Sequence, residues 1–489
     1  MITNQAAKHP RWFITPVFFL ILLSSAAGKP FDAEYSLTLT AENLEIHKDV
    51  FFEENRGAIG FDYGPIELRA DFSLMGGRRY RSHTTFQMDR YFFINNASVN
   101  FQLENATFYA GYLPHHDIVK TPYSVYISSV DIPALNAGLS YVHNRFFYET
   151  RWVRLNERSS VEYIGKDETY RDRGLTFKAF GMHFGNFTIG FEDSYSYLDQ
   201  SFDAESLLSP VPMFLFEMIL ASSGRPWSQD NNVNSMMGFF AEWESGPYYL
   251  EGQILIDDIN ASALAPIAGS FIPALNTIEN LSKVAWSLGG TIGLRTGTLG
   301  FYHGGATKYT YEATYTTASN YSTVPYEYVY YPATEYEELP GTLTMIPYED
   351  NYIGYMYGEN NLAFLVDYST KLLQKSPWSF DLAASAEWVL NGSKSPANPW
   401  HEYTHWREIE PPVELLTDSS IENLFHMRAE VSKRIDPFEL SLSVLLGYGW
   451  NQLELVELVP GEPKIFVPQP GNDGVRFSIA LSGKYGVEF

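Results

Sequence analysis

The sequence lacks cysteine entirely and, after residue 30, lacks any uninterrupted apolar run of the ~20 residues that a membrane-spanning helix requires. Without cysteine, the chain can form neither a disulfide bond nor the lipid-modified cysteine of a lipoprotein. The longest apolar candidate, Val211 to Ala221, is interrupted by Pro212 and Glu217. If this chain spans a membrane, it must do so as a closed β-barrel, because only helices and closed barrels satisfy their backbone hydrogen bonds in lipid.

Basic residues are scarce as well. Lys and Arg number 33 against 58 Asp and Glu, which gives a formal net charge of −25. A chain this acidic repels phosphate backbones, so we expect no nucleic-acid partner. The acidic side chains suit a polar lumen and loop surfaces. We expect no cofactor and assign no metal ligand.

Aromatic residues, in contrast, are abundant: 34 Tyr, 34 Phe and 10 Trp make up 16% of the chain. Membrane-spanning strands carry such residues in girdles at both lipid interfaces. Strand-like segments recur from end to end between Gly, Pro, Asn and Asp, and no linker divides them. At ~25 residues per strand and connection, the chain supplies about 16 to 20 strands. The sequence therefore predicts an all-β fold, a single large antiparallel transmembrane barrel.

The last fifteen residues, VRFSIALSGKYGVEF, predict the closing strand. Apolar residues from Val475 to Phe489 fall on one parity with Gly483 as the only gap, while Arg476 and Lys484 fall on the other. A period of two indicates a strand with one apolar face, as in a wall between lipid and a polar lumen. Its end, with Tyr485, Val487 and Phe489, resembles the C-terminal insertion signal of outer-membrane barrels. The alternative is the last strand of a soluble all-β domain.

The N-terminus predicts a secretory signal peptide. Lys8 and Arg11 precede the apolar run Trp12 to Leu23, and five small residues, 24–28, follow. We expect cleavage after Ala27 or Gly28, which leaves residues 29–489 as one barrel domain after a signal peptide of residues 1–28. The predicted location is the cell outer membrane, reached through Sec export, with outer-membrane lipid and the barrel-assembly machinery as partners.

Alternating patterns place eighteen strand segments along the chain. They are Ala33–Leu44, Ala58–Tyr63, Ile66–Leu74, Tyr91–Leu103, Ala106–Gly111, Leu139–His143, Phe146–Leu155, Gly174–Gly181, Phe187–Phe191, Met236–Trp243, Tyr248–Ile256, Ala285–Thr296, Leu299–His303, Leu362–Tyr368, Phe380–Val389, Phe425–Lys433, Glu439–Trp450 and Val475–Phe489. The stretches 203–221 and 261–283 favour short helices outside the lipid, at the periplasmic side or in the lumen. Leu113 to Asn136 is less regular.

Several segments together resemble the capsule-assembly Wzi family of outer-membrane barrels. They are the block Tyr123 to Asn156, the triplet Asp230, Asn231 and Asn232, and YYLEGQILIDDI with its paired Asp257 and Asp258. The resemblance covers about two thirds of the chain and rests on the order of its segments. It implies a barrel of about 18 strands whose pore is obstructed, and a role in holding surface polysaccharide. One departure is PHHDIVKTP, residues 114–122, where a Trp-Gly-rich segment is expected.

Two aromatic stretches are candidate glycan-binding sites. Aromatic ring faces cover the apolar face of a sugar, while nearby carboxylates and amides bind its hydroxyl groups. The alternative is that these rings belong to girdles or strand surfaces. The candidates are Tyr309, Tyr311, Tyr315, Tyr328, Tyr330 and Tyr331 in one stretch and Trp400, Tyr403 and Trp406 in the other.

Other polar motifs have simpler explanations. HEYTH at 401–405 matches a zinc-protease pattern, but prolines surround it, no third ligand is evident, and a polar loop is the better interpretation. The Asp230 triplet and the Asp257 pair fit turn capping better than a cation site. His115-His116-Asp117 is a weak metal motif.

The sequence thus predicts a non-enzymatic outer-membrane barrel that binds or anchors a surface polysaccharide or assists envelope assembly. The alternative is a porin-type channel for small hydrophilic solutes, which has a similar composition. An enzyme would need a catalytic constellation that the sequence does not reveal. An open lumen favours the channel, and a lumen blocked by residues 261–283 or by the loops favours polysaccharide binding.

Overall fold

The computed structural model describes residues 31–42, 51–76, 90–130, 132–157, 172–198, 200–213, 215, 233–258, 282–311, 335–339, 342–345, 353–372, 379–394, 413–456 and 465–488. Eighteen strands in this part of the chain form one antiparallel sheet. They are β1 (Phe31–Glu42), β2 (Phe51–Tyr63), β3 (Ile66–Gly76), β4 (Arg90–Gln102), β5 (Ala106–Leu113), β6 (Ala134–His143), β7 (Phe146–Asn156), β8 (Arg173–Phe184), β9 (Phe187–Leu198), β10 (Val233–Ser245), β11 (Tyr248–Asp258), β12 (Lys283–Leu294), β13 (Gly297–Ala306), β16 (Asn361–Leu372), β17 (Phe380–Asn391), β18 (Glu422–Ile435), β19 (Phe438–Trp450) and β22 (Gly474–Glu488).

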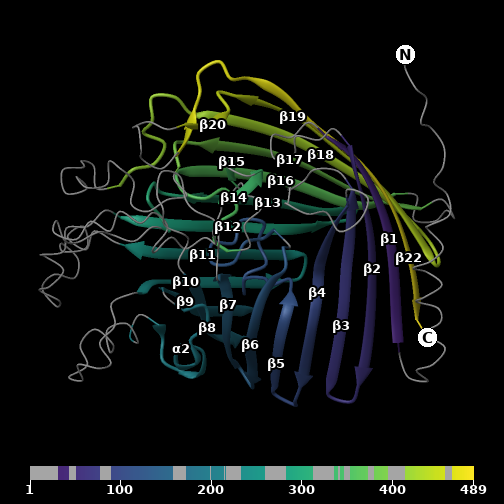
Figure 1. Ribbon diagram of the computed structural model, residues 1–489, viewed down its shortest axis with the longest axis vertical. Helices are drawn as coiled ribbons and strands as arrows, with labels where there is room; N and C mark the ends of the chain where they lie inside the picture. Colours follow the sequence, from purple (N-terminus) through teal and green to yellow (C-terminus); the bar gives the residue numbers. More distant parts are fainter. Residues whose placement is uncertain are drawn as a thin grey trace, which may run out of the picture.

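The sheet closes into a barrel because β1 pairs with both β2 and β22. The first strand meets the last from Asp32 opposite Glu488 to Glu42 opposite Ser478. Each remaining barrel strand pairs with its neighbours along the chain, so the closed ladder has no free edge. In Figure 1 the first strands run nearly vertically and β10 to β18 nearly horizontally, as tilted strands on opposite walls do. The fold prediction is confirmed, including the expectation of about 18 strands.

Short turns and long connections lie at opposite edges of the barrel. Two-residue turns join β2 to β3 at Gly64-Pro65, β6 to β7 at Asn144-Arg145 and β8 to β9 at Gly185-Asn186. Gly64, Asn144 and Gly185 have φ of 59°, 55° and 64°, the left-handed conformation that tight hairpins require. The connections from β5 to β6, β9 to β10, β11 to β12 and β13 to β16 all belong to the other edge. In outer-membrane barrels the long connections are extracellular.

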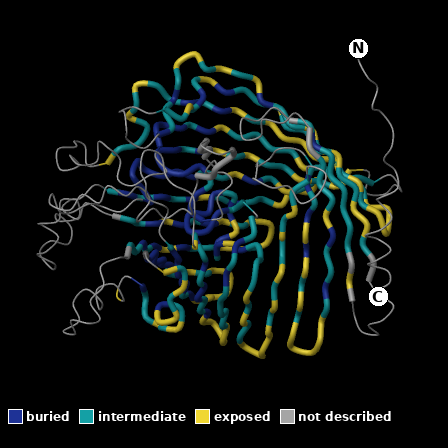
Figure 2. Tube along the Cα trace, viewed as in Figure 1, coloured by how far each residue is buried: buried dark blue, intermediate teal, exposed yellow. Residues whose placement is uncertain are grey.

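Side chains alternate between the two faces of the wall. On β11, Leu250 and Ile254 are exposed on the outward face, whereas Gln253 and Leu255 are buried on the inward face. The closing strand follows the predicted pattern, with Val475 and Leu481 exposed outward and Arg476 buried. Figure 2 shows this alternation as yellow segments along the wall, with the buried residues concentrated inside the barrel.

Two small hairpins accompany the barrel. One pairs β14 (Glu335–Leu339) with β15 (Thr342–Met345), and the other pairs β20 (Leu453–Val456) with β21 (Ile465–Pro468). Both lie in connections of the long-connection edge. A bridge between Lys394 and Phe466 ties the second hairpin to the end of β17.

Helix is nearly absent from the described residues. The helix α2 (Ala204–Leu208) begins after Asp203, whose carboxylate accepts a hydrogen bond from the Glu205 N–H at 2.9 Å. No helix in the described part of the chain is long and apolar enough to cross a membrane.

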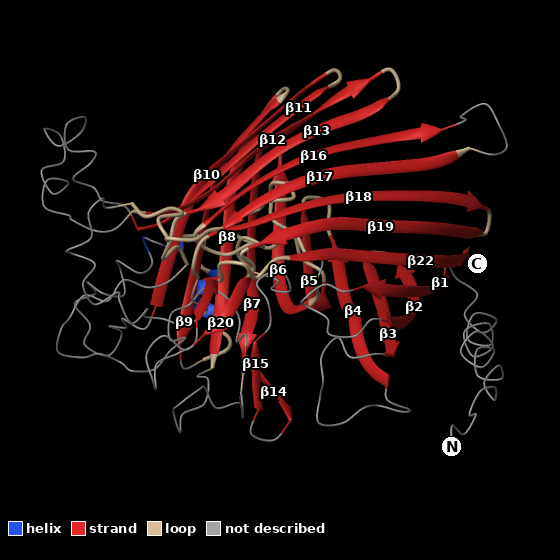
Figure 3. Ribbon diagram, turned by 90° about the horizontal axis from the view of Figure 1, so that it is seen from above, coloured by secondary structure: helices blue, strands red, loops and turns tan. Residues whose placement is uncertain are grey.

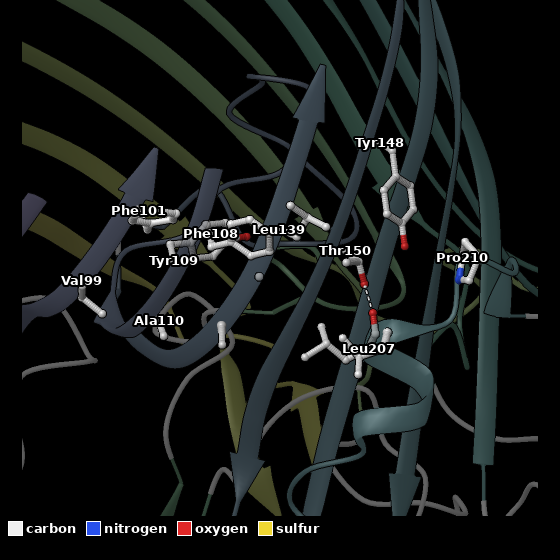
Figure 4. A pocket seen from close by; sticks show the side chains of 13 residues that line it. Val99, Phe101, Phe108, Tyr109, Ala110, Leu139, Tyr148, Thr150, Leu207 and Pro210 are labelled. Carbon is white, nitrogen blue, oxygen red and sulfur yellow. Dashed lines mark hydrogen bonds between the residues drawn. The ribbon is translucent and has the colours of Figure 1, made fainter. Parts of the chain in front are cut away.

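The position of α2 differs from the prediction. We expected short helices at the periplasmic side or in the lumen, but α2 belongs to the connection between β9 and β10, which starts at the long-connection edge, and lies near β8 and β9 (Figures 1 and 3). Its hydrogen bonds to the wall place it on the outward face (Figure 4). The reason is that outward-facing polar side chains of β7 and β8 bind its carbonyl and hydroxyl groups. The second candidate helix, 261–283, lies outside the described residues except for Ser282 and Lys283.

Candidate functional site

The connection between β5 and β6 turns into the barrel and crosses its interior. We call residues 114–130 the plug segment. The Tyr123 hydroxyl donates a hydrogen bond of 2.8 Å to Glu387 on β17. The Tyr126 hydroxyl donates to a backbone carbonyl of β9 at 3.3 Å, and Thr121 lies 3.0 Å from the Ser287 hydroxyl on β12. Because one segment bonds to three separate parts of the wall, it obstructs the lumen between them.

Asp117 organises the plug segment from within. Its carboxylate accepts hydrogen bonds from the backbone N–H groups of Ile118 at 2.7 Å and of Tyr126 and Ile127 at 3.1 Å each. Burial raises the pKa of Asp117, and the donated hydrogen bonds partly offset that rise. The carboxylate therefore holds together two parts of the segment that are nine or more residues apart.

Gln253 on β11 connects the wall to the plug segment. Its amide nitrogen donates to Asp117 at 2.9 Å and to Glu192 of β9 at 2.7 Å, and its amide oxygen accepts from the Val125 N–H at 3.0 Å. All these groups are buried. One side chain thus donates to two buried carboxylates. Without it, each carboxylate would lack this hydrogen bond in a place where water cannot replace it.

Two further segments, 307–311 and 353–360, pack against the plug segment. The Tyr311 hydroxyl donates to the Val125 carbonyl at 2.9 Å and accepts from the Tyr355 N–H at 3.3 Å. The Gly354 N–H donates to the Tyr126 carbonyl at 3.0 Å. The three segments therefore form one interlocked body inside the barrel.

Tyr123, Tyr355 and Tyr357 form an aromatic cluster at the centre of this body. Their ring centroids lie 5.9 to 6.3 Å apart, and Tyr357 also donates to Glu387 at 2.8 Å. Burial and the neighbouring Glu387 raise the pKa of the Tyr123 hydroxyl well above its usual value, so it remains a proton donor. The cluster continues into inward side chains of seven strands: Val153, Phe177, Leu255, Ala306, Ala363, Val389 and Leu424.

The opposite part of the inner wall is polar and less buried. Lys484 of β22 lies 2.8 Å from Glu34 of β1, and Arg69 of β3 lies 2.7 Å from Glu67. Arg56 also pairs with a carboxylate of β3. The side chains of the first two pairs are part-exposed, so water reaches this side of the lumen. The interior is therefore asymmetric, with a packed side and a hydrated side.

A polar pocket of about 400 Å³ lies within the plug segment itself. The Lys120 side chain is exposed at this pocket. Hydroxyl and charged side chains in a cavity of this size suit a small polar ligand such as a sugar unit. Its lining consists of His116, Asp117, Val119, Lys120, Thr121, Pro122, Ser124, Ser128 and Ser129.

Some predicted site residues lie in the described structure. Tyr309 and Tyr311 are 2% and 0% exposed and have positive φ, so neither presents a ring face to solvent. Asp257 pairs with Lys283 at 3.0 Å and accepts from the Tyr311 N–H at 3.0 Å. Asp258, at the end of β11, lies opposite Lys283 across a β-bulge.

In the closing strand, the Tyr485 ring packs against Phe438, with 5.1 Å between their centroids. The backbone of Val487 lies in β22. His115-His116-Asp117 lies in the plug segment, where the His116 carbonyl accepts from Arg151 at 2.8 Å. Among the described residues, no three His, Asp or Glu side chains converge as a metal site.

The remaining predicted residues lie outside the described part of the chain, as do the HEYTH motif and residues 1–28, the predicted signal peptide. Their roles stay predictions. They are Asp230, Asn231, Asn232, Tyr315, Tyr328, Tyr330, Tyr331, Trp400, Tyr403, Trp406 and Phe489.

Sequence reasoning missed the residues that build the plug. Asp117 was noted only as part of a weak metal motif, and Gln253 and Glu387 sit on strands as ordinary inward polar residues. An inward glutamate or glutamine has the same place in the alternating pattern whether it faces water or a packed segment. The available signal was the loss of strand periodicity from Leu113 to Asn136.

The closed antiparallel barrel, its outward apolar residues and its single long-connection edge define the outer-membrane β-barrel fold. Comparison with solved structures gives the same class. Over 97% of this chain and 89% of the other, the fold is similar to Wzi, an outer-membrane protein involved in group 1 capsule assembly in Escherichia coli and described as a carbohydrate-binding β-barrel, with a TM-score of 0.50 and 11% identity.

Two further solved structures are also similar. OprD of Pseudomonas aeruginosa matches with a TM-score of 0.46 and 10% identity, over 94% of this chain and 95% of that one. OccAB2 of Acinetobacter baumannii gives 0.46 and 9%, over 94% and 98%. No family model matches the sequence, and no curated protein matches it.

Proposed function

We propose that this chain lies in the outer membrane as an obstructed, non-enzymatic barrel that binds or anchors a surface polysaccharide. The observation that carries the proposal is the plug segment, which bonds to β9, β12 and β17 and buries its tyrosines completely. A packed interior hinders the passage of solutes, whereas it gives a binding protein a rigid support for its long connections.

Two further features support polysaccharide as the ligand. The pocket beside Lys120 offers hydroxyl and charged groups at sugar size. The aromatic stretches around Tyr328 and Trp400 belong to connections of the long-connection edge, which is extracellular in this fold. The structural likeness to a carbohydrate-binding barrel is consistent with this assignment.

Single-channel conductance in a planar bilayer is the first test. The purified, refolded protein should insert without stable conductance steps, because the interlocked segments block the lumen. Stable conductance that added polysaccharide leaves unchanged would contradict the proposal and favour a porin.

Polysaccharide retention tests the binding sites. Trp400→Ala and Trp406→Ala should reduce the amount of surface polysaccharide that cells retain, because each removes a stacking surface worth about 1 kcal/mol or more. The matched control is Trp243→Ala, since Trp243 lies on the outward wall. Equal retention in all three variants would remove these tryptophans from the binding site.

A channel for small hydrophilic solutes is the second candidate. The part-exposed ion pairs of β1, β3 and β22 favour it, because they line a hydrated side of the lumen. If small solutes pass there, liposomes containing the protein should swell in an isotonic solution of the solute. Swelling without polysaccharide retention would favour this second function.

A further inference from the structure

Two arginines of the inner wall differ from their cationic neighbours. Arg428 of β18 and Arg476 of β22 face the lumen, because they alternate with the exposed apolar residues of their strands. Elsewhere on the hydrated side, Arg56, Arg69 and Lys484 each pair with a carboxylate. Among the described residues, no carboxylate pairs with Arg428 or Arg476. The described protein thus gives these two cations no counter-ion, although the net charge of the chain is −25.

Arg476 is buried in spite of its charge. Only 8% of the residue is exposed, and its Nη1 lies 3.4 Å from the Nε2 of His426 on β18. Arginine has only donors, so the imidazole nitrogen is the acceptor and the contact leaves the positive charge unpaired. The Nε–H is buried and has no hydrogen-bond acceptor in the part of the chain that the structure describes. Because a buried guanidinium without a counter-ion costs free energy, an anion that reached Nε would remove this cost.

A glycine lets the two side chains meet. Gly447 of β19 lies between Arg476 and His426 in the strand register. A Cβ at this position would lie 2.5 Å from the Cδ2 atom of the His426 ring, so a residue with a side chain would push the ring away. The space above Gly447 therefore holds the imidazole ring, which reaches across β19 to the guanidinium.

Arg428 completes a cluster that we call the arginine site, formed by Arg428, Arg476 and His426. Arg428 is the next inward residue after His426 on β18, and the charges of both arginines act on the imidazole ring. Arg428 is exposed, whereas Arg476 is buried. The site thus has one cation that a ligand meets in water and a second that the ligand would meet below the surface of the wall.

Most of the arginine site lies in the half of the wall nearer the long-connection edge. β18 and β22 both begin at this edge, and His426 and Arg476 lie close to the starts of their strands. Opposite His426 on β17 is Glu387, whose carboxylate already accepts hydrogen bonds from two tyrosine hydroxyls. In outer-membrane barrels this edge is extracellular, so a ligand from the cell surface would reach the site along the hydrated side of the lumen.

We propose that the arginine site binds the carboxylate of an acidic sugar in the surface polysaccharide. The inference rests on the proposed function and names the chemistry of its ligand. The Nε and Nη2 atoms of a guanidinium lie on one edge and donate in parallel to the two oxygens of a carboxylate. In Arg476 this edge makes no hydrogen bond to a described residue, since Nη1 is the atom that contacts His426. A neutral hydroxyl could accept one such hydrogen bond but could not balance the charges of Arg428 and Arg476.

The test compares two forms of the surface polysaccharide purified from the cells that produce the protein. One form is native, and in the other the carboxyl groups have been reduced to alcohols, which removes the charge and keeps the sugar chain. Binding to the full-length protein in detergent micelles is measured by isothermal titration calorimetry at low salt. The reduced form should bind at least about tenfold more weakly than the native form, the loss expected for one hydrogen bond between charged groups.

Glutamine variants test the two arginines. Arg428→Gln and Arg476→Gln should each weaken the binding of native polysaccharide by about tenfold. Arg434→Gln is the matched control and should bind like the parent protein, because Arg434 lies at the other end of β18 and pairs with Asp436 at 3.4 Å. Urea titration separates binding from folding. Arg476→Gln should be at least as stable as the parent protein, since it removes an unpaired buried charge.

Equal binding of both polysaccharide forms, or parent-like binding by both arginine variants, would overturn the proposal and leave the proposed function standing. A marked loss of stability in Arg476→Gln would assign Arg476 to the fold instead. Free galacturonate that bound as tightly as the polysaccharide would assign the site to small acidic solutes and also contradict the proposal. If the parent protein bound neither form, the proposed function would fail together with the inference. Heat-modifiable migration establishes that each variant is folded.

Discussion

Gln253 is a single inward side chain that fixes the plug segment to the wall. It donates to both Asp117 and Glu192 and accepts from Val125. Gln253→Leu keeps a similar volume but leaves three buried polar groups with fewer partners. We expect a loss of about 1–3 kcal/mol in the free energy of unfolding, measured by urea titration of the folded, heat-modifiable form.

The matched control is Gln102→Leu. Gln102 is exposed at the end of β4, near the short-turn edge. Its replacement should change stability by less than about 0.5 kcal/mol. If both variants lost the same stability, the hydrogen bonds of Gln253 would not be what holds the plug segment.

Glu387 accepts from two tyrosine hydroxyls, which makes a double-mutant cycle informative. Tyr123 and Tyr357 each donate to the same carboxylate oxygen at 2.8 Å. Each single change to Phe should cost about 1 kcal/mol, since one donor remains. The double variant should lose more than the sum, because Glu387 then keeps neither donor. Strict additivity in the same urea titration would mean that solvent replaces the lost donors.

At the scale of elements, two long connections lie on opposite sides of the wall. They are the plug segment, residues 114–130, and the strap, residues 200–213. The plug segment turns inward and meets β9, β12 and β17, while the strap turns outward and meets β7 to β9. Both are anchored mainly by side chains of the wall bonding to loop backbone or hydroxyl groups. The wall therefore determines on which side each connection lies.

Replacing residues 117–129 with a Gly/Ser linker of equal length should open the lumen. The linker removes the bonds of Asp117, Tyr123 and Tyr126 to each other and to the wall. The 18-stranded ladder does not depend on these bonds. The expected result is a folded barrel with stepwise conductance in a planar bilayer, where the parent protein is silent.

The strap supplies the control for this experiment. The same kind of linker in place of residues 201–212 removes an external element and leaves the interior intact. This variant should insert without conductance. Equal conductance from both variants would show that the steps arise from general destabilisation of the barrel.

The element scale also shows where prediction from sequence succeeded. All eighteen barrel strands were predicted, because alternation of apolar and polar residues is a local property that one strand carries by itself. Boundaries were less accurate: β2 begins at Phe51, earlier than the predicted Ala58, and β9 extends beyond Phe191 to Leu198. In both cases successive extra residues are alike, as in Glu53-Glu54 of β2 and Glu192-Asp193 of β9, so alternation fades.

At the scale of the whole molecule, barrel closure joins the two ends of the chain. β22 pairs with β1 from Ser478 to Glu488, and the Tyr485 ring packs against Phe438 of β19. Deletion of the C-terminal Phe489 should reduce the fraction of protein assembled in the outer membrane, because the predicted insertion signal then loses its terminal aromatic. The measurement is the heat-modifiable fraction in isolated outer membranes.

Lys484→Ala is the control for the deletion. Lys484 forms a part-exposed ion pair with Glu34 across the closing seam, a kind of pair worth about 1 kcal/mol at most. Assembly of this variant should match the parent protein. Normal assembly after deletion of Phe489 would count against the insertion signal.

The sequence by itself determined that this chain forms a closed barrel. The absence of long apolar runs left a closed barrel as the way to cross a membrane, and period-two segments such as Val475 to Glu488 specified walls with one apolar face. Tertiary structure decided what the walls enclose and what they carry outside. Gln253 and Lys178 occupy ordinary strand positions in the sequence, and only the folded chain shows that one holds a plug and the other a strap. The physical reason is that alternation assigns a residue to a face, whereas its partner comes from a distant connection that local pattern does not encode.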